Sequence, residues 1–516
     1  MGRSRRQADT RNLFRNFREG YFTAPKATHL LDVRQLHNPT LMEYSLPDDK
    51  ASVRDIASRL ELFVDDFLIE SLRSARLQLH HPHRADVALH FDAPWEGIFA
   101  GAVTAFQDGP IYRMYYRGKP NVGGDGSDDE VICYAESSDG VHWKKPQLGF
   151  FEVLGTRQNN VILTPDVTTC HYFSPFLDTR PGVPDQERYK AITGVHPGGL
   201  KALASADGIR WRMLQDAPIL ISETFAFDSQ NIAFWSENEG HYVMYFRTWK
   251  AIPGEAGMGY RWVSRTTSDD FLHWSTPVEM DMGDTPLEHI YTNQTHPYFR
   301  APHLYISLAA RFQQGKQVLT REEAQALGVS EQYYGDCSDT ILMTSRGGSR
   351  YDRTFMESFV RPGIGSQNWV SRTNYPGCGV IPTGPNEMSL FVSREYAQQS
   401  AHIARYTLRT DGFASINAPY GGGEFLTRPL TFTGKTLSLN CSTSAAGSIQ
   451  VEIQDAHGKA LPGFELNQCI PIVGDEIAKR VQWKSTPDLR KRAGQAVRLR
   501  FVMRDADLYA LQFLAS

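Results

Sequence analysis

The chain has 516 residues, which is too long for one ordinary domain and predicts two or three structural units. Hydrophobic residues make up 41% of the chain and charged residues 22%, which is typical of a soluble globular protein. Lysine and arginine number 54 against 58 aspartate and glutamate residues, and the net charge of −4 without a long basic run argues against a nucleic-acid partner.

The first 60 residues are polar and show little periodicity, so residues 1–60 are predicted to form an N-terminal extension. Arg5 and Arg6 form the twin arginine of an export signal, but the apolar stretch that such a signal requires does not follow. No run of eighteen apolar residues occurs, which argues against a membrane partner. We therefore expect a cytoplasmic protein, and a secreted form whose signal has been removed stays open.

One phrase repeats along the chain: a strand, a serine, an acidic turn and a tryptophan. It occurs as YAESSDGVHW (134–143), ALASADGIRW (202–211) and VSRTTSDDFLHW (263–274), with looser copies at 341–355 and 404–416. The three tryptophans are spaced by about 65 residues, and Asp-Gly between strand-like runs is a hairpin signal. Each copy follows two further strand-like runs, so the chain contains five similar antiparallel units.

Five such units predict an all-β fold, a five-bladed β-propeller over residues 61–421. One or two β-sandwiches are the competing interpretation. The strand-like segment 61–71 is expected to help close the ring. After three glycines at 421–423 the strands alternate apolar and polar residues, which predicts a C-terminal β-sandwich over 422–516.

The six cysteines form no Cys-x-x-Cys pair and no cluster with histidine, so the sequence predicts neither a zinc site nor a disulfide scaffold. Free and mostly buried thiols are expected, while a pairing of Cys441 with Cys469 stays open. We expect no cofactor and no metal site, because no spacing brings His171, His196 and His289 together.

Phrases such as LFVDDFLIES, YRMYYRG, YAESSDGVHW and EFLTRPLTF, on this order of units, resemble glycoside hydrolase family 32 and its relatives, families 43, 62 and 68. The resemblance covers roughly residues 61–516. It implies a saccharide substrate and three carboxylates that project from the first three blades. The Asn-Asp-Pro-Asn-Gly, Arg-Asp-Pro and Glu-Cys-Pro signatures of those families are missing, so their catalytic residues are not carried over.

Candidate catalytic residues come instead from strand geometry. Innermost strands of a propeller begin at the mouth and second strands end there, so acids at these positions can converge. Glycoside hydrolysis requires one carboxyl group as acid and one as nucleophile or base. We predict Asp228 as the nucleophile or base and Glu96 or Glu288 as the acid. The alternative is that each carboxylate forms a salt bridge with an arginine between adjacent blades.

The same geometry nominates residues that bind the substrate. Arginines end four of the five second strands, and guanidinium groups grip carboxylate or sulfate, which suggests an anionic or heavily hydroxylated saccharide. An equal alternative is that these arginines only balance the neighbouring acids. The predicted binding residues are Asp66, Arg117, His171, Gln230, Asn231, Arg247, His289, Asp336, Trp369, Arg372 and Asn374.

Other functions on the same scaffold stay open: a non-catalytic carbohydrate-binding propeller, a sialidase-like enzyme, a lyase or a mannoside phosphorylase. The hydrolase hypothesis requires two of Glu96, Asp228 and Glu288 to lie about 5–10 Å apart across an open pocket. A binding protein would keep aromatic surfaces without such a pair.

Overall fold

The structure is a computed structural model that describes residues 44–45, 53–120, 129–222, 227–252, 254, 257–329 and 332–515. Strands dominate these residues, and the chain from residue 43 onward forms one compact unit. Most of the predicted N-terminal extension lies outside the described residues. In the described part, no helix combines the length and hydropathy that crossing a membrane requires.

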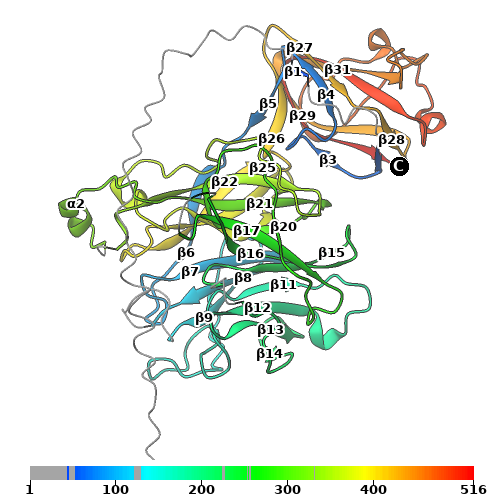
Figure 1. Cartoon of the computed structure of the whole chain (residues 1–516). Helices are drawn as coiled ribbons and strands as arrows, with labels where there is room; N and C mark the ends of the chain where they lie inside the picture. The colour runs from blue at the N-terminus through cyan, green and yellow to red at the C-terminus, as the bar shows by residue number, and fades with distance from the viewer. Residues whose placement is uncertain are drawn as a thin grey trace, which may run out of the picture. The chain divides into compact units, whose positions relative to one another are not determined.

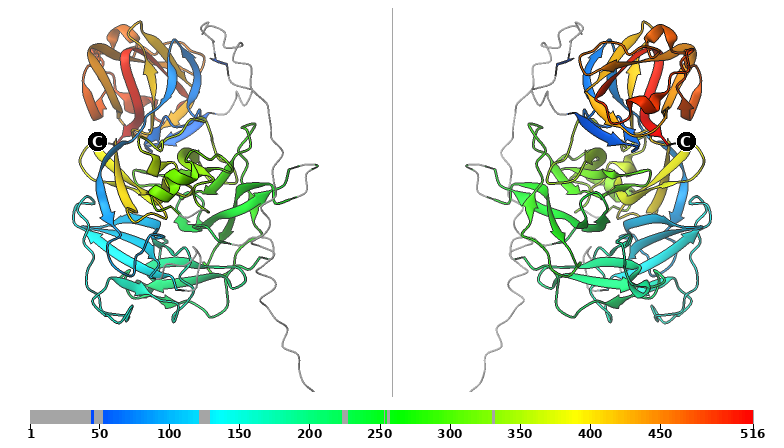
Figure 2. Two further views of the ribbon diagram at one scale, coloured as in Figure 1. Left: turned by 90° about the vertical axis from the view of Figure 1, so that its left-hand side faces the viewer. Right: turned by 90° about the vertical axis from the view of Figure 1, so that its right-hand side faces the viewer.

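Most described strands fall into five successive antiparallel groups (Figures 1 and 2). The innermost strands contact one another in sequence order and the last contacts the first, so the groups form a closed ring. These strands are β7 (Gly101–Asp108), β11 (Ser174–Leu177), β15 (Ile232–Ser236), β20 (Thr295–Tyr298) and β23 (Tyr375–Pro382). The all-β propeller class is confirmed, while the count of five blades stays a prediction with which the five groups agree.

The second and third strands of the groups are largely buried, because each pairs with a strand on both sides and packs against neighbouring groups. The remaining ring strands are, by group, β8 (Ile111–Gly118), β9 (Val131–Ser137) and β10 (Val161–Leu163); β12 (Tyr189–Val195), β13 (Gly199–Ser205) and β14 (Arg212–Met213); β16 (His241–Lys250), β17 (Tyr260–Ser268) and β18 (Val278–Glu279); β19 (His289–Thr292), β21 (Ala301–Gln313) and β22 (Cys337–Ser345); and β24 (Glu387–Arg394), β25 (His402–Arg409) and β6 (His83–His90). Short helices in the connections are α2 (Arg321–Ala326), η3 (Asp185–Glu187), η4 (Ser366–Asn368), η5 (Leu466–Gln468) and η6 (Leu489–Arg492).

The ring closes through β6, which precedes the first group in sequence but pairs with β25 of the last, so that His90 lies opposite His402. The prediction that residues 61–71 close the ring is wrong. Those residues include β3 (Glu61–Leu62) and most of β4 (Ile69–Arg73), which pair with C-terminal strands instead. The last group therefore takes its outer strand from the N-terminal side, which ties the two ends of the ring together.

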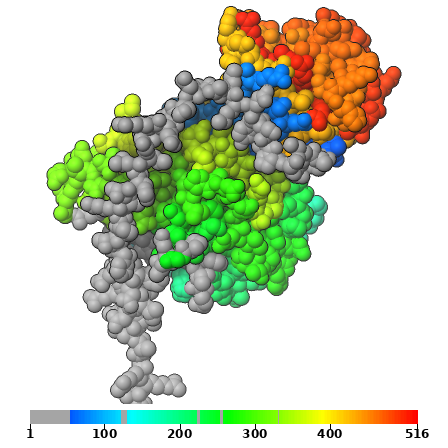
Figure 3. Space-filling view, turned by 45° about the horizontal axis from the view of Figure 1, so that its top comes forward, coloured from blue at the N-terminus to red at the C-terminus, as the bar shows by residue number. Residues whose placement is uncertain are grey.

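The C-terminal sheet is also built from both ends of the described chain, and blue N-terminal residues lie among orange and red C-terminal ones in Figure 3. Its longest strands, β29 (Thr436–Asp455) and β31 (Val497–Leu514), pair along most of their length, with a register shift between Thr443 and Ser448. The sheet therefore extends beyond the predicted range 422–516. Its other strands are β1 (Tyr44–Ser45), β2 (Arg54–Ala57), β3, β4, β5 (Arg76–Leu79), β26 (Ala414–Ala418), β27 (Gly423–Thr427), β28 (Leu430–Phe432) and β30 (Asp475–Arg480).

Aromatic side chains fill the core of this sheet. Phe432 stacks on Phe513 with ring centroids 3.7 Å apart, and Phe425 stacks on Phe501 at 5.3 Å.

All six cysteines of the chain are buried as free thiols, so the open pairing of Cys441 with Cys469 does not form.

The repeated serine–acid–tryptophan phrase forms the same turn three times. In each copy a serine Oγ accepts a backbone N–H at 2.9 Å, and the aspartate carboxylate accepts another at 2.8 Å. Trp143 then packs on Phe391 of the fifth group at 5.5 Å, and Trp211 on Tyr115 of the first at 6.3 Å. The motif therefore stabilises turns and joins neighbouring groups. In each copy the serine hydroxyl also donates a hydrogen bond to the aspartate carboxylate: Ser137 to Asp139, Ser205 to Asp207, and Ser268 to Asp270.

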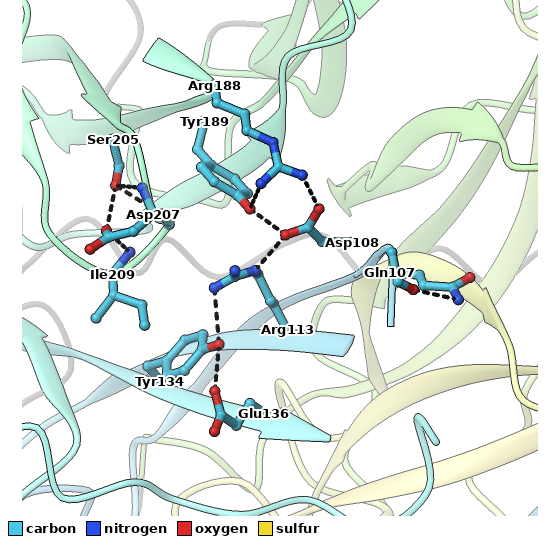
Figure 4. A network of polar contacts seen from close by, with 12 residues as sticks. Gln107, Asp108, Arg113, Tyr134, Glu136, Arg188, Tyr189, Ser205, Asp207 and Ile209 are labelled. Atoms are coloured by element: carbon cyan, nitrogen blue, oxygen red, sulfur yellow. Dashed lines mark hydrogen bonds and ion pairs between the residues drawn. The ribbon is translucent and has the colours of Figure 1, made fainter. Parts of the chain in front are cut away.

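Asp108, at the end of β7, connects the first and second groups (Figure 4). Its carboxylate accepts hydrogen bonds from Arg188, from Tyr189 and, at 3.2 Å, from Nε of Arg113. Arg113 donates in turn to the Tyr134 hydroxyl at 3.1 Å. Burial raises the pKa of Asp108, but the hydrogen bond from Tyr189 and the charges of both arginines outweigh burial and hold this pKa below its ordinary value.

We expect Asp108→Asn to lower the free energy of unfolding by about 3 kcal/mol, because it leaves the buried Arg113 guanidinium without its counter-ion. Urea unfolding at pH 7 measures this, with the exposed Asp166→Asn as control. The folded pKa is depressed, so the carboxylate stabilises the fold above about pH 4, and this contribution disappears as the pH falls through the folded pKa. Equal stability of the variant and the wild type at pH 7 contradicts this role of Asp108.

Candidate active site at the mouth of the ring

Residues at the starts of the innermost strands converge on one rim of the ring, here called the mouth. All five groups contribute to a narrow cavity at this rim, and its lining is polar and aromatic. The lining residues are Gly101, Ala102, Arg117, Tyr172, Gln230, Thr292, Gln294, Arg372, Tyr375, Pro376, Ser393 and Tyr396.

Two glutamines close the channel below the mouth. Nε2 of Gln230 donates to Oγ1 of Thr104 at 2.9 Å, and Nε2 of Gln294 donates to Oε1 of Gln230 at 2.7 Å and to the Pro376 carbonyl at 3.0 Å. Both side chains are buried. Beyond them lies a mainly apolar cavity lined by residues such as Phe234. The mouth is therefore separated from the other end of the channel.

Arg117, at the end of β8, is fixed by partners on several sides. Its Nη1 donates to Glu130 at 3.2 Å, its Nη2 donates to the Phe99 carbonyl at 2.9 Å, and its guanidinium lies 5.0 Å from the Tyr172 ring centroid. The other oxygen of Glu130 lies 2.8 Å from Nδ1 of His171. Burial raises the pKa of Glu130, but Arg117 and His171 outweigh it and lower that pKa. Glu130 is thus ionised with both oxygens engaged.

Asp228 is the accessible carboxylate of this cluster. It precedes β15 and accepts a hydrogen bond from Nη2 of Arg247 near the end of β16. The Asp228 side chain is 44% exposed, whereas Arg247 is 6% exposed. Partial removal from water raises the pKa of Asp228, but the charge and hydrogen bond of Arg247, with a smaller contribution from His171, outweigh this and lower it. Asp228 is therefore an ionised carboxylate that solvent reaches.

Three guanidinium groups surround the ring of Tyr291. The distances from guanidinium carbon to ring centroid are 4.7 Å for Arg247, 5.2 Å for Arg261 and 5.7 Å for Arg372. The Tyr291 ring also packs against Tyr375 at 5.2 Å. The two rings are tilted at 48° to each other, and Tyr291 is buried whereas Tyr375 is partly exposed. An exposed ring can pack against a sugar, and the cations contribute positive potential.

The backbone at the mouth is strained. Six non-glycine residues at or just before the innermost strands have φ between 46° and 70°. Each such residue costs about 1–2 kcal/mol, and clusters of such residues typify functional sites. They are Ala102, Tyr172, Phe227, Gln294, Arg372 and Asn374.

The pKa of Asp336 is displaced in the opposite direction from that of Asp228. It precedes β22 and accepts a hydrogen bond from the Gly315 N–H at 2.6 Å. Burial raises the pKa of Asp336, and that hydrogen bond together with the charge of Arg261 offsets the rise only in part. Arg261 interacts electrostatically with both carboxyl groups. Arg261 thus lies within electrostatic reach of two acids whose pKa values are displaced in opposite directions, without forming an ion pair with either in the described part of the chain.

The other two predicted catalytic acids are not brought to Asp228. Glu96 is fully buried, where it accepts hydrogen bonds from the Tyr116 hydroxyl at 2.6 Å and from Lys145 at 2.8 Å. The two oxygens of Glu288 are each taken by an arginine, Arg311 at 3.2 Å and Arg353 at 2.6 Å. Both acids thus form salt bridges, but with partners within their own group rather than between adjacent blades as the alternative hypothesis stated.

Several predicted binding residues have structural partners. Asn231 donates to the Phe227 carbonyl at 3.1 Å, and Asn374 donates to the Ser338 carbonyl at 2.9 Å. Trp369 donates to the Gly363 carbonyl at 3.1 Å. Asp66 does not lie in the ring, because it belongs to the turn between β3 and β4 of the C-terminal sheet. The predicted binding residues that the structure places in or beside the cluster are Arg117, His171, Gln230, Arg247, Asp336 and Arg372.

The histidines of the mouth do not form a metal site. His171 is bound to Glu130, and Nδ1 of His289 accepts the Arg261 N–H at 3.1 Å. His196 is exposed and contacts the Ser222 carbonyl. Among the described residues there is no group of three His, Cys, Asp or Glu side chains that could hold a metal ion.

Sequence reasoning missed Glu130, Arg261 and Tyr291. Glu130 immediately precedes β9, and Arg261 is the second residue of β17, so both mark the start of a third strand. An antiparallel third strand begins at the rim where the second strand ends, so its first residues return to the mouth. Inspection of third-strand starts is the signal that would have found Glu130 and Arg261, and Asp336 holds the equivalent place before the third strand β22.

No protein-family model and no curated protein sequence matches the chain. Among solved structures it is similar to a protein described as a glycoside hydrolase, with 12% identity, a TM-score of 0.42 and coverage of 64% of this chain and 92% of that one. A fructofuranosidase from Schwanniomyces occidentalis gives 10% identity, a TM-score of 0.38 and coverage of 82% and 96%. An N-acetylgalactosamine deacetylase from F. plautii gives 13% identity, a TM-score of 0.36 and coverage of 70% of this chain and 96% of that one. The likeness is too distant to assign a reaction, and the resemblance to family 32 stays a prediction.

We expect Glu96→Gln to lower the free energy of unfolding by about 2 kcal/mol, because Lys145 and Tyr116 lose a charged partner. Saccharide binding and any turnover should stay unchanged, since Glu96 has no oxygen free for a ligand. Thermal unfolding and a binding assay measure the two effects, with the exposed Glu152→Gln as control. Loss of binding or turnover in a stable Glu96→Gln protein would return this residue to the active site.

Proposed function

We propose that the chain is a glycoside hydrolase whose chemistry takes place at the mouth, with Asp228 as the ionised carboxylate and Asp336 as the acid. One observation carries the proposal: two carboxyl groups with oppositely displaced pKa values lie within electrostatic reach of Arg261, beside the rings of Tyr291 and Tyr375. Hydrolysis of a glycosidic bond needs one ionised and one protonated carboxyl group at neutral pH.

The roles follow from these states. Asp336 keeps a proton to a higher pH than an ordinary aspartate and can give it to the leaving oxygen. Asp228, held ionised by Arg247, attacks the anomeric carbon or takes a proton from the attacking water. Tyr375, which is partly exposed and packs on the buried Tyr291, offers a ring face against which a sugar packs. The Gln230–Gln294 barrier leaves the mouth as the route by which substrate reaches these groups.

We expect wild type to cleave at least one member of a panel of aryl glycosides and oligosaccharides that includes uronate-containing and sulfated ones. Asp228→Asn should lose about 10²–10⁴-fold in kcat, because it removes the charge that attacks or activates water. Asp269→Asn is the control, since its side chain is 96% exposed. Turnover that Asp228→Asn leaves unchanged refutes this assignment, and saccharide binding without any turnover favours a carbohydrate-binding protein instead.

The acid is tested through the leaving group. Asp336→Asn should lose about 10²-fold or more on a sugar leaving group but little on a dinitrophenyl group, which departs without a proton. The pH profile should show an optimum with a loss of activity on each side. Activity should fall as the pH drops through the lowered pKa of Asp228, and again as the pH rises through the raised pKa of Asp336. Equal losses on both leaving groups exclude Asp336 as the acid.

A further inference from the structure

A cavity lined by basic side chains, here called the outer cavity, lies apart from the mouth and has a volume of about 460 Å³. Its walls come from the start of β6, the connection between β22 and β23, the end of β24 and β25. It shares no lining residue with the cavity at the mouth. Ser393 lines the mouth and Arg394 lines the outer cavity, because successive residues of a strand point to opposite faces.

The charged side chains of the outer cavity are all of one sign. No aspartate or glutamate of the described chain lines it. Its basic lining residues are Arg84, Arg361 and Arg394, with His81 and His83. Two of them also hold its wall in place: Nδ1 of His81 donates to the Phe359 carbonyl at 3.2 Å, and Nη2 of Arg394 donates to the Pro362 carbonyl.

Arg394 is a buried cation whose partners are neutral. Its side chain is 2% exposed, and its Nη1 donates to Oδ1 of Asn374. Its Nε is buried with no hydrogen-bond partner in the described part of the chain, and no described carboxylate forms an ion pair with it. An amide and a carbonyl do not neutralise a guanidinium group, so this buried charge is left without a counter-ion.

Two exposed arginines add to the positive charge. Neither Arg84 nor Arg361 forms an ion pair with a carboxylate of the described chain, and the hydrogen bond of Arg84 goes to Nε2 of His402, at 3.1 Å. Burial lowers the pKa of Arg394, and repulsion from Arg84 adds to this effect. Tyr406 and Glu395 offset the lowering only in part. A negative charge in the outer cavity would therefore lower the free energy of all three arginines.

The acids on the neighbouring strands are bound elsewhere. Asp86 of β6 and Glu387 of β24 both pair with Arg405, at 2.7 Å and 3.1 Å. Strand β25 and the connection over residues 359–368 contain no acidic residue. The elements that form the outer cavity thus bring three arginines to it and keep their own carboxylates away from it.

We propose that the outer cavity binds an oxyanion carried by a small organic molecule, with Arg84 and Arg361 as its direct ligands. Guanidinium forks pair with the oxygens of a carboxylate, a sulfate ester or a phosphate ester. The buried charge of Arg394 behind them favours an anion over a neutral ligand. The volume falls within the range of about 300–1,000 Å³ typical of small-molecule sites, so the ligand is larger than a single ion. This site does not depend on the proposed hydrolase.

Equilibrium binding to the full chain tests the site without any turnover. Calorimetric titrations at constant ionic strength compare phenyl phosphate, phenyl sulfate and benzoate with the neutral benzyl alcohol. We expect at least one of the three anions to bind about tenfold or more tightly than benzyl alcohol, because charge-assisted hydrogen bonds form only with the anion. Selective binding of one anion identifies the group that the site takes. Binding of no anion, or binding no tighter than that of benzyl alcohol, overturns the proposal.

Variants assign the binding to the outer cavity. The double variant Arg84→Gln with Arg361→Gln should weaken binding of the anion about tenfold or more, while benzyl alcohol changes little. Both arginines are exposed, so the fold should tolerate their replacement, and each single variant decides in the same direction if the double variant does not fold. The matched control is Arg210→Gln, since that arginine is 71% exposed on a turn. Unchanged affinity in the folded variants places the bound anion elsewhere and overturns the proposal.

Discussion

Antiparallel pairing within the ring determines which side chains can meet at the mouth. Each innermost strand begins at the mouth, its neighbour ends there, and the third strand begins there again. Asp228 precedes an innermost strand, Arg247 lies near the end of a second strand and Arg261 opens a third, all within one group. The short connections of a four-stranded sheet are thus enough to place an acid and two arginines together. Closure of the ring adds the neighbouring groups, whose Tyr291 and Arg372 complete the cluster.

Occupancy of oxygen atoms separates structural acids from reactive ones in this ring. Glu96 and Glu288 each have both oxygens engaged by donors, and Asp108 binds two arginines and a tyrosine between the first two groups. Asp228 accepts a hydrogen bond from one side chain in the described part of the chain, that of Arg247, and its own side chain is 44% exposed. An acid with unused lone pairs in contact with solvent can bind substrate or water, whereas a saturated one would first have to break an ion pair.

The repeated groups of the ring could be predicted from the sequence, and the reason is physical. The turn motif repeats because its serine and aspartate satisfy the same backbone N–H groups in every copy, so its spacing reports the size of one group. In contrast, the sequence of a strand does not show with which other strand it pairs. Segment 61–71 has the pattern of a strand but pairs with residues more than 350 positions away, whereas His83–His90, which closes the ring, does not carry the repeated phrase.

The same distinction governs the site. Arg117, Arg247 and Asp228 could be nominated because strand ends are visible in the sequence. The sequence could not show which acids already have partners, because those partners lie far away along the chain. Lys145 is 49 residues from Glu96, and Arg353 is 65 residues from Glu288. The surroundings of Arg261 are also a property of the assembled mouth, because its three aromatic neighbours come from two different groups of the ring.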